Sequence, residues 1–185
     1  MQTAGARRAA LRPAATTLVG GLVLATLLAA CEQAERPVGP TNATTPRFTV
    51  GSGSQSTLIG RATFAERFHV KRKTDGWEVD IKAKNPLDVA VQSITFQPGG
   101  HSGWHRHPGP VFIQVVSGTM TFYESDDPSC TPTVRTAGQG YLDTGEHAHI
   151  ARNESGAPAV NLVTYFAPPG AALRIDAPNP GNCPF

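Results

Sequence analysis

Residues 99–110 read Gly99-Gly100-His101-Ser102-Gly103-Trp104-His105-Arg106-His107-Pro108-Gly109-Pro110, and an apolar segment over residues 111–116 follows directly. Residues two apart in an extended segment point to the same side, so His105 and His107 can aim both imidazoles at one point. His149 is the natural third nitrogen donor, because it stands at the start of another apolar-rich segment. Three neutral imidazoles at about 2.0–2.1 Å would hold a divalent first-row metal and leave positions open for water or substrate.

The histidines are clustered in the sequence, and a random distribution explains this poorly. The chain has 6 histidines, and all but His69 lie in two short clusters, each with a His-x-His pair beside a glycine-containing turn and an apolar strand. His147 shares a strand face with His149, so both are potential ligands. These two clusters predict a metal site, and the alternative is a cavity that takes an organic ligand without metal.

The spacing of these residues resembles a known family. Gly99, the pair His105 and His107, and Gly118 are similar to the first conserved motif of the cupin superfamily. The segment 138–153, in which a histidine is followed four positions later by an asparagine, is similar to the second motif. The resemblance implies a complete single-domain cupin over roughly residues 58–166.

The resemblance implies His105, His107 and His149 as the metal ligands. The glutamate that usually completes the cupin metal site would fall at Val111, so the fourth protein ligand is absent from its usual place. Gln114 does not replace it, because the period of two puts Gln114 on the other face of its strand. The Pro-x-Gly of the second motif appears only as Thr-Gly-Glu over residues 144–146.

We therefore expect an all-β protein, a single double-stranded β-helix of the cupin jelly-roll type with a ligand cavity at one end. The 19 glycines and 16 prolines, with only 16% charged residues, suit turns between short strands. Alternating or apolar segments predict strands at 58–64, 68–73, 77–84, 89–96 and 159–166. We also expect a hairpin that joins 111–116 to 119–123 through Ser117-Gly118. A formal net charge of +2, without basic clusters among aromatics, gives no indication of nucleic-acid binding.

The amino terminus reads as an export signal. Residues 1–30 join a basic region to an apolar stretch that ends Leu-Ala-Ala before Cys31, which resembles the lipobox of a bacterial lipoprotein. Cys31 would then carry the lipid, and the protein would sit in the cell envelope, anchored to a membrane. An ordinary signal peptide is the alternative. Residues 31–56, rich in Pro, Thr, Gly and Ser, are interpreted as a flexible tether that precedes a barrel over 57–170.

Export changes the interpretation of the other cysteines. With Cys31 assigned to the lipid, Cys130 and Cys183 remain as an even pair in an oxidising compartment, so we predict a disulfide between them. Closing a loop of about 50 residues would stabilise the fold by about 4 kcal/mol on the chain-entropy model. The bridge would tie the carboxy-terminal arm, residues 171–185, to the barrel.

Four more residues are candidates for the surroundings of the site. His147 is expected to hydrogen-bond a ligand histidine or line the cavity, and His101 is placed with it. Trp104 either forms a wall of the cavity or packs under its loop. Glu146, the nearest acid in sequence to His149, is either a proton shuttle or extra ligand, or an exposed turn residue.

The sequence favours an exported protein that binds a divalent metal, iron, manganese or zinc, through three histidines, with a small-molecule ligand in the barrel. A dioxygenase-type oxidoreductase is the enzymatic form of this hypothesis, by resemblance to all-histidine dioxygenases among cupins. The alternative is a non-catalytic periplasmic binding module with a degenerate or absent metal site. A homodimer stays open, since cupins often dimerise.

Overall fold

The computed structural model describes residues 48–185. The predicted signal peptide, Cys31 and most of the predicted tether lie outside the described residues. Within 48–185 all secondary structure is β, and this part of the chain contains no helix long and apolar enough to cross a membrane. The strands are β1 (Ser52–Phe64), β2 (Phe68–Thr74), β3 (Trp77–Ala83), β4 (Leu87–His101), β5 (His105–Arg106), β6 (Val111–Ser117), β7 (Thr119–Glu124), β8 (Thr133–Thr136), β9 (Gly140–Asp143), β10 (His149–Arg152), β11 (Ala159–Ala167) and β12 (Ile175–Asp176).

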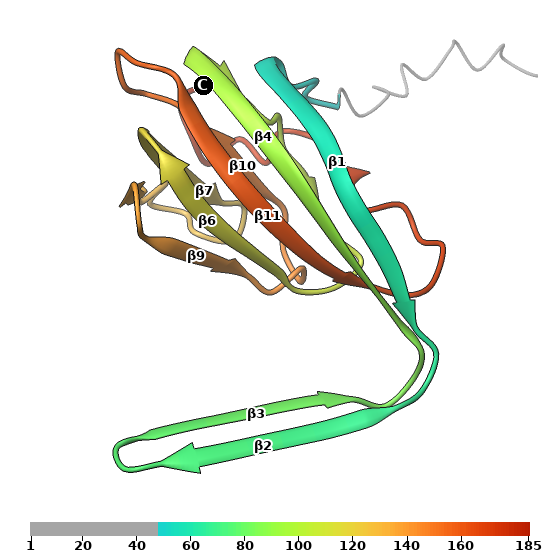
Figure 1. Cartoon of the computed structure of the whole chain (residues 1–185). Coiled ribbons are helices and arrows are strands. Elements are labelled where there is room, and N and C mark those ends of the chain that lie inside the picture. The colour runs from blue at the N-terminus through green and yellow to red at the C-terminus, as the bar shows by residue number, and fades with distance from the viewer. Residues whose placement is uncertain (1–47) are drawn as a thin grey trace, which may run out of the picture. The chain divides into compact units, whose positions relative to one another are not determined.

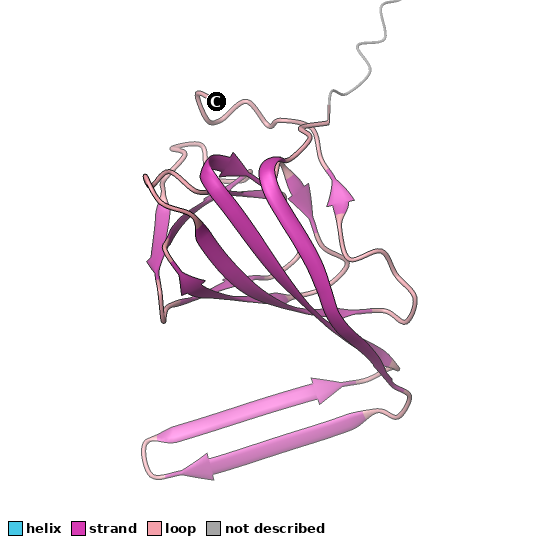
Figure 2. Cartoon of the chain, turned by 45° about the horizontal axis from the view of Figure 1, so that its top comes forward, coloured by secondary structure: helices cyan, strands magenta, loops and turns pink. Residues whose placement is uncertain are grey.

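Ten strands form one antiparallel sheet that curls into a nearly closed barrel (Figures 1 and 2). On one side β4 lies between β1 and β11, β11 also pairs with β6, and β6 with β9. On the other side β10 pairs with β7 and β5, while β8 and β12 flank them. This is the double-stranded β-helix of the cupin type, so the predicted fold class is confirmed.

The barrel core follows from the period of two in its strands. Along β11 buried and partly exposed residues alternate without interruption, and the first residues of β6 alternate between buried and exposed. Alternate side chains therefore point inward from both strands, and Gln114 faces away from the core, as the sequence predicted. The core cluster gathers Ala90, Phe96, Val111, Ile113, Val115, Met120, Phe122, Ala151, Ala159, Val163 and Tyr165.

The expected hairpin around Ser117-Gly118 is wrong. β6 pairs with β9 and β11, whereas β7 pairs with β8 and β10, so the chain crosses at this turn from one side of the barrel to the other. Gly118 has a φ of 77°, and a Cβ there would lie 2.8 Å from the Cα of Ala159. The glycine thus permits a tight corner between the two sides of the barrel, and a Ser-Gly pair in the sequence is equally typical of a hairpin turn.

The predicted strands at 68–73 and 77–84 are confirmed as β2 and β3, with the Thr-Asp-Gly turn between them. They pair only with each other among the described strands. The strand before them begins earlier than expected, because β1 starts at Ser52, inside the predicted tether. Its polar residues are exposed, and its backbone pairs with β4 from Ser52 onward, so backbone hydrogen bonds order a segment whose composition resembles a linker.

A second cluster lies beneath the carboxy-terminal arm. Trp104, Tyr123 and Ile150 pack there with Ala177 and Cys183. Cys183 forms a disulfide with Cys130, at a Cα–Cα distance of 5.2 Å that suits such a bond. The predicted pairing is therefore present. β12 adds a second attachment of the arm, because it pairs with β5.

Candidate metal centre

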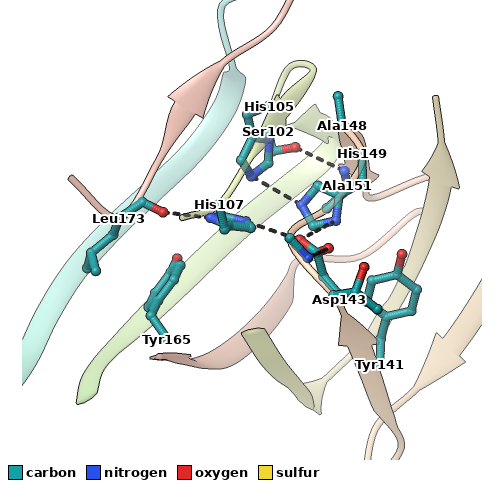
Figure 3. Close-up of polar contacts among 12 residues, drawn as sticks. Ser102, His105, His107, Tyr141, Asp143, Ala148, His149, Ala151, Tyr165 and Leu173 are labelled. Atoms are coloured by element: carbon teal, nitrogen blue, oxygen red, sulfur yellow. Dashed lines mark hydrogen bonds and ion pairs between the residues drawn. The ribbon is translucent and has the colours of Figure 1, made fainter. Parts of the chain in front are cut away.

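The fold brings three histidines from two segments to one point inside the barrel. His105 belongs to β5 and His107 follows it, while His149 opens β10 and lies opposite His105 in the β5–β10 pair. One nitrogen from each ring lies within 4.8 Å of the other two. All three residues are at most 6% exposed. Figure 3 shows the rings converging, so the three residues picked from the sequence do meet and could bind a metal.

Backbone carbonyls fix the orientation of two of the rings. The Nδ1 of His105 lies 2.8 Å from the carbonyl oxygen of Gly103, and the Nδ1 of His107 lies 2.6 Å from that of Leu173. A carbonyl oxygen only accepts, so each Nδ1 must carry the proton. The lone pairs of the two Nε2 atoms are therefore free to bind a metal, an arrangement common in protein metal sites.

The neutral ring of His149 carries one N–H proton, but both of its nitrogens face a polar atom. Its Nδ1 lies 3.3 Å from Oδ2 of Asp143, and its Nε2 lies 3.2 Å from Nε2 of His105. A neutral imidazole that gives its proton to the Asp143 side leaves two nitrogen lone pairs facing each other. The opposite tautomer sets a lone pair against a carboxylate. A cation at the meeting point of the Nε2 atoms satisfies both contacts.

Burial disfavours a proton in the place of that cation. Burial lowers the pKa of His149 well below its usual value of 6.5 and, with a smaller effect from His107, lowers the pKa of His105 to about 3. The rings are thus neutral at pH 7, the state in which imidazole binds metals. The Nε2–Nε2 separation of 3.2 Å is close to the value of about 3.3 Å for two nitrogens bound tetrahedrally at 2.0–2.1 Å. The spacing of His105 and His149 therefore fits a divalent ion.

Asp143 is a site residue that the sequence reasoning missed. It ends β9, is 4% exposed, and its Oδ2 lies 3.6 Å from Nε2 of His107 as well as beside His149. Its Oδ1 accepts a hydrogen bond from the backbone N–H of Gly145, at 2.7 Å. Burial raises the pKa of this carboxyl. The Asp-Thr-Gly sequence predicts a turn, and that signal concealed the second role of the side chain.

Two cavities adjoin the histidines. An inner cavity of ≈ 30 Å³ is lined by His105, His107 and His149, a volume sufficient for an ion or a water. Asn161 also lines it, is 2% exposed, and its Oδ1 has no hydrogen-bond partner among the described residues. A buried, unpartnered oxygen on a residue that lines the same cavity as the three histidines fits a polar occupant there.

An outer cavity of ≈ 360 Å³ opens from this point toward solvent. His105, His107 and Tyr165 line both cavities, so the outer space leads to the histidine cluster. Burial raises the pKa of Tyr165 to about 12, and its hydroxyl donates a hydrogen bond to Oε1 of Gln92 at 2.9 Å. A small molecule in the outer cavity would therefore touch the rings that hold the metal.

Four residues expected around the site lie elsewhere. Trp104 is fully buried in the second cluster, so it packs under its loop and forms no wall of either cavity. Glu146 is exposed in the turn before β10. His147 is half exposed and faces Asp126 at 3.5 Å, and His101 accepts a hydrogen bond from the backbone of Gly103. None of the four lines the two cavities.

The comparisons with known proteins agree with the architecture. Residues 92–165, which span both histidine clusters, match the family model described as "Cupin domain". This match supports membership of the cupin superfamily. No curated protein matches the chain.

Solved structures with a similar fold include several cupins. A cupin domain from Bordetella pertussis is 20% identical, with a TM-score of 0.43, over 63% of this chain and 95% of that one. The polyketide cyclase RemF from Streptomyces resistomycificus is 13% identical, with a TM-score of 0.47, over 72% of this chain and 80% of that one. At these identities the similarity concerns the fold and says nothing of activity.

Proposed function

We propose that the barrel binds one divalent transition-metal ion through the Nε2 atoms of His105, His107 and His149 and takes a small-molecule ligand in the outer cavity. The observation that carries this proposal is the single proton of His149, which cannot serve both Asp143 and His105. While Asp143 is ionised, a cation at the Nε2 atoms satisfies both contacts. Burial lowers the pKa of His149 and so disfavours a proton in that role.

The chemistry of such a site depends on charge. Three neutral ligands leave the full charge of the ion in place, and a bound ion of this kind would supply Lewis acidity to a ligand or a water. The carbonyls of Gly103 and Leu173 orient two of the rings, and the carboxyl of Asp143 lies 3.3 Å from Nδ1 of the third. The candidate ions are iron, manganese and zinc, and imidazole donors would also accept nickel or copper in vitro.

We propose that the enzymatic form of this function is an oxidoreductase of the dioxygenase type. Support comes from the all-histidine donor set and from the open cavity beside it. The alternative is a non-catalytic binding module. Val111 favours that alternative, because it is fully buried in the core at the position where the family motif has its glutamate.

We further propose that the protein is an exported lipoprotein anchored through Cys31. The Cys130–Cys183 disulfide supports an oxidising compartment. A Cys31→Ala variant should move from the membrane fraction to the soluble fraction of cells. Unchanged fractionation would contradict lipid anchoring.

Cobalt(II) titration tests the metal site. The full chain should bind one equivalent and develop visible absorption bands, whose intensity separates four-coordinate from six-coordinate ions. The bands should vanish in a His105→Ala, His107→Ala double variant and persist in His147→Ala, a change at an exposed histidine two residues from His149. Equal spectra for all three proteins would refute the site.

Turnover separates the enzyme from the binding module. Metal-dependent oxygen uptake with candidate thiols or diols would favour the enzyme. Ligand-induced thermal stabilisation without oxygen uptake would favour the module.

A further inference from the structure

The outer cavity carries information about the ligand itself. Its volume of ≈ 360 Å³ falls at the low end of the range for small-molecule sites, which excludes polymers as occupants of the whole space. Ile94, Phe96 and Leu173 give it apolar surface, whereas Ser54, Ser56 and Gln92 line it with polar groups. A ligand that matches this lining is small and has both an apolar and a polar part.

Arg174 supplies the only lysine or arginine side chain among the residues that line this cavity. Its Nε donates to Oδ1 of Asp176 at 2.6 Å, and its two terminal nitrogens donate no hydrogen bond within residues 48–185. The side chain is 37% exposed. Two free donors of a planar guanidinium form a fork that fits a carboxylate.

The backbone ties Arg174 to the histidine cluster. The preceding residue, Leu173, accepts the hydrogen bond from His107, and Asp176 lies opposite His105 in the β5–β12 pair. The charge of Arg174 is close enough to contribute to the lowered pKa values of all three histidines. An anion bound by Arg174 would therefore lie next to the metal ligands.

We propose that the ligand of the outer cavity is a small organic carboxylate, held by the terminal nitrogens of Arg174 beside the histidine cluster. This inference names the ligand class of the function proposed above and rests on it. Asp176 offsets part of the arginine charge, but it engages only Nε and leaves the fork open. The apolar lining receives the remainder of the molecule.

Isothermal titration of acids and their matched amides tests the proposal. Acetate with acetamide, benzoate with benzamide, and hexanoate with hexanamide differ in charge at nearly constant shape. On the full chain in detergent, at least one acid should bind at least tenfold more tightly than its amide. Arg174→Gln should lower the affinity for that acid by about tenfold, the loss expected for a charge-assisted hydrogen bond. The affinity for the matched amide should stay unchanged.

Two variants complete the design. Arg106→Gln changes an exposed arginine of β5 that lines neither cavity, and it should bind the acid as the wild type does. Arg174→Lys should retain part of the affinity. Equal affinities for acids and amides, no binding of any acid, or equal effects of the Arg174 and Arg106 variants would each overturn the proposal.

The titrations are run on zinc-loaded and on metal-free protein, with bound zinc measured in each. Failure to bind zinc would refute the proposed metal site, while the metal-free titrations still decide whether Arg174 selects carboxylates. Zinc binding without selection for acids would leave the metal site standing and overturn only the ligand class.

Discussion

Asp143 lies directly opposite Val111 in the antiparallel β6–β9 pair. The strand that faces the usual glutamate position therefore brings a carboxylate to the histidines, 3.3 Å from Nδ1 of His149 and 3.6 Å from Nε2 of His107. The position itself carries a buried valine. An acid is thus present at this site, although its place in the sequence differs from the family motif.

Replacing Asp143 should weaken metal binding. Asp143→Asn keeps an oxygen for the N–H of Gly145 but removes the charge beside His149, so the metal affinity should fall by about 10- to 100-fold. Competition with a fluorescent zinc chelator measures this affinity. Asp126→Asn, at an exposed acid that faces His147, should leave the affinity unchanged. Equal affinities for the Asp143 variant and the wild type would show that this carboxylate does not support the site.

The disulfide should hold the arm that completes the site. In a Cys130→Ser, Cys183→Ser variant the chain-entropy model removes about 4 kcal/mol of stability. Residues 173–177 should then detach more often, because Cys183 and Ala177 share one apolar cluster. Trypsin should cleave after Arg174 several-fold faster than in the wild type, whereas cleavage in the exposed β2–β3 hairpin should keep its rate. Equal rates of trypsin cleavage after Arg174 in both proteins would show that the disulfide does not hold the arm.

Glu124 should make the stability of the metal-free protein depend on pH. Burial, with Asp143 and Asp126 nearby, raises the pKa of Glu124 from 4.5 to about 7. The folded protein then binds more protons than the unfolded chain between these values, so the unfolding free energy falls as pH rises through this window. Since the side chain is partly exposed, we expect a loss of about 1 kcal/mol above pH 7.

Glu124→Gln tests this dependence. The amide still accepts the hydrogen bond from the hydroxyl of Tyr141, and it carries no charge at any pH. Urea unfolding should show the variant more stable than the wild type at pH 8 and nearly equal to it at pH 4.5. A difference that does not change with pH would contradict the raised pKa.

The sequence predicted the features that depend on short-range periodicity. The period of two placed Val111, Ile113 and Val115 inside and Gln114 outside, and it put His105 and His107 on one face. The two histidine clusters also indicated that the segment with His105 and His107 meets the segment with His149, because a shared metal site explains two such clusters in one chain. Cys130 and Cys183 could be paired by count once Cys31 was set aside.

The remaining features depend on long-range pairing that a single sequence does not encode locally. Ser117-Gly118 forms a corner between the two sides of the barrel, since β6 and β7 pair with other strands and not with each other. Asp143 reads as a turn residue, and only the β6–β9 register brings its second oxygen to the histidines. Trp104 directly precedes His105 in the sequence, yet its side chain packs in the cluster beneath the arm.

The most direct test is the metal content of the full chain, purified without chelator and without a nickel affinity tag, measured by inductively coupled plasma mass spectrometry. The wild type and His147→Ala should contain close to one equivalent of iron, manganese or zinc, and His149→Ala should contain almost none, while all three give the same circular dichroism spectrum. Equal metal content in His149→Ala and His147→Ala, or no metal in the wild type, would contradict the three-histidine site.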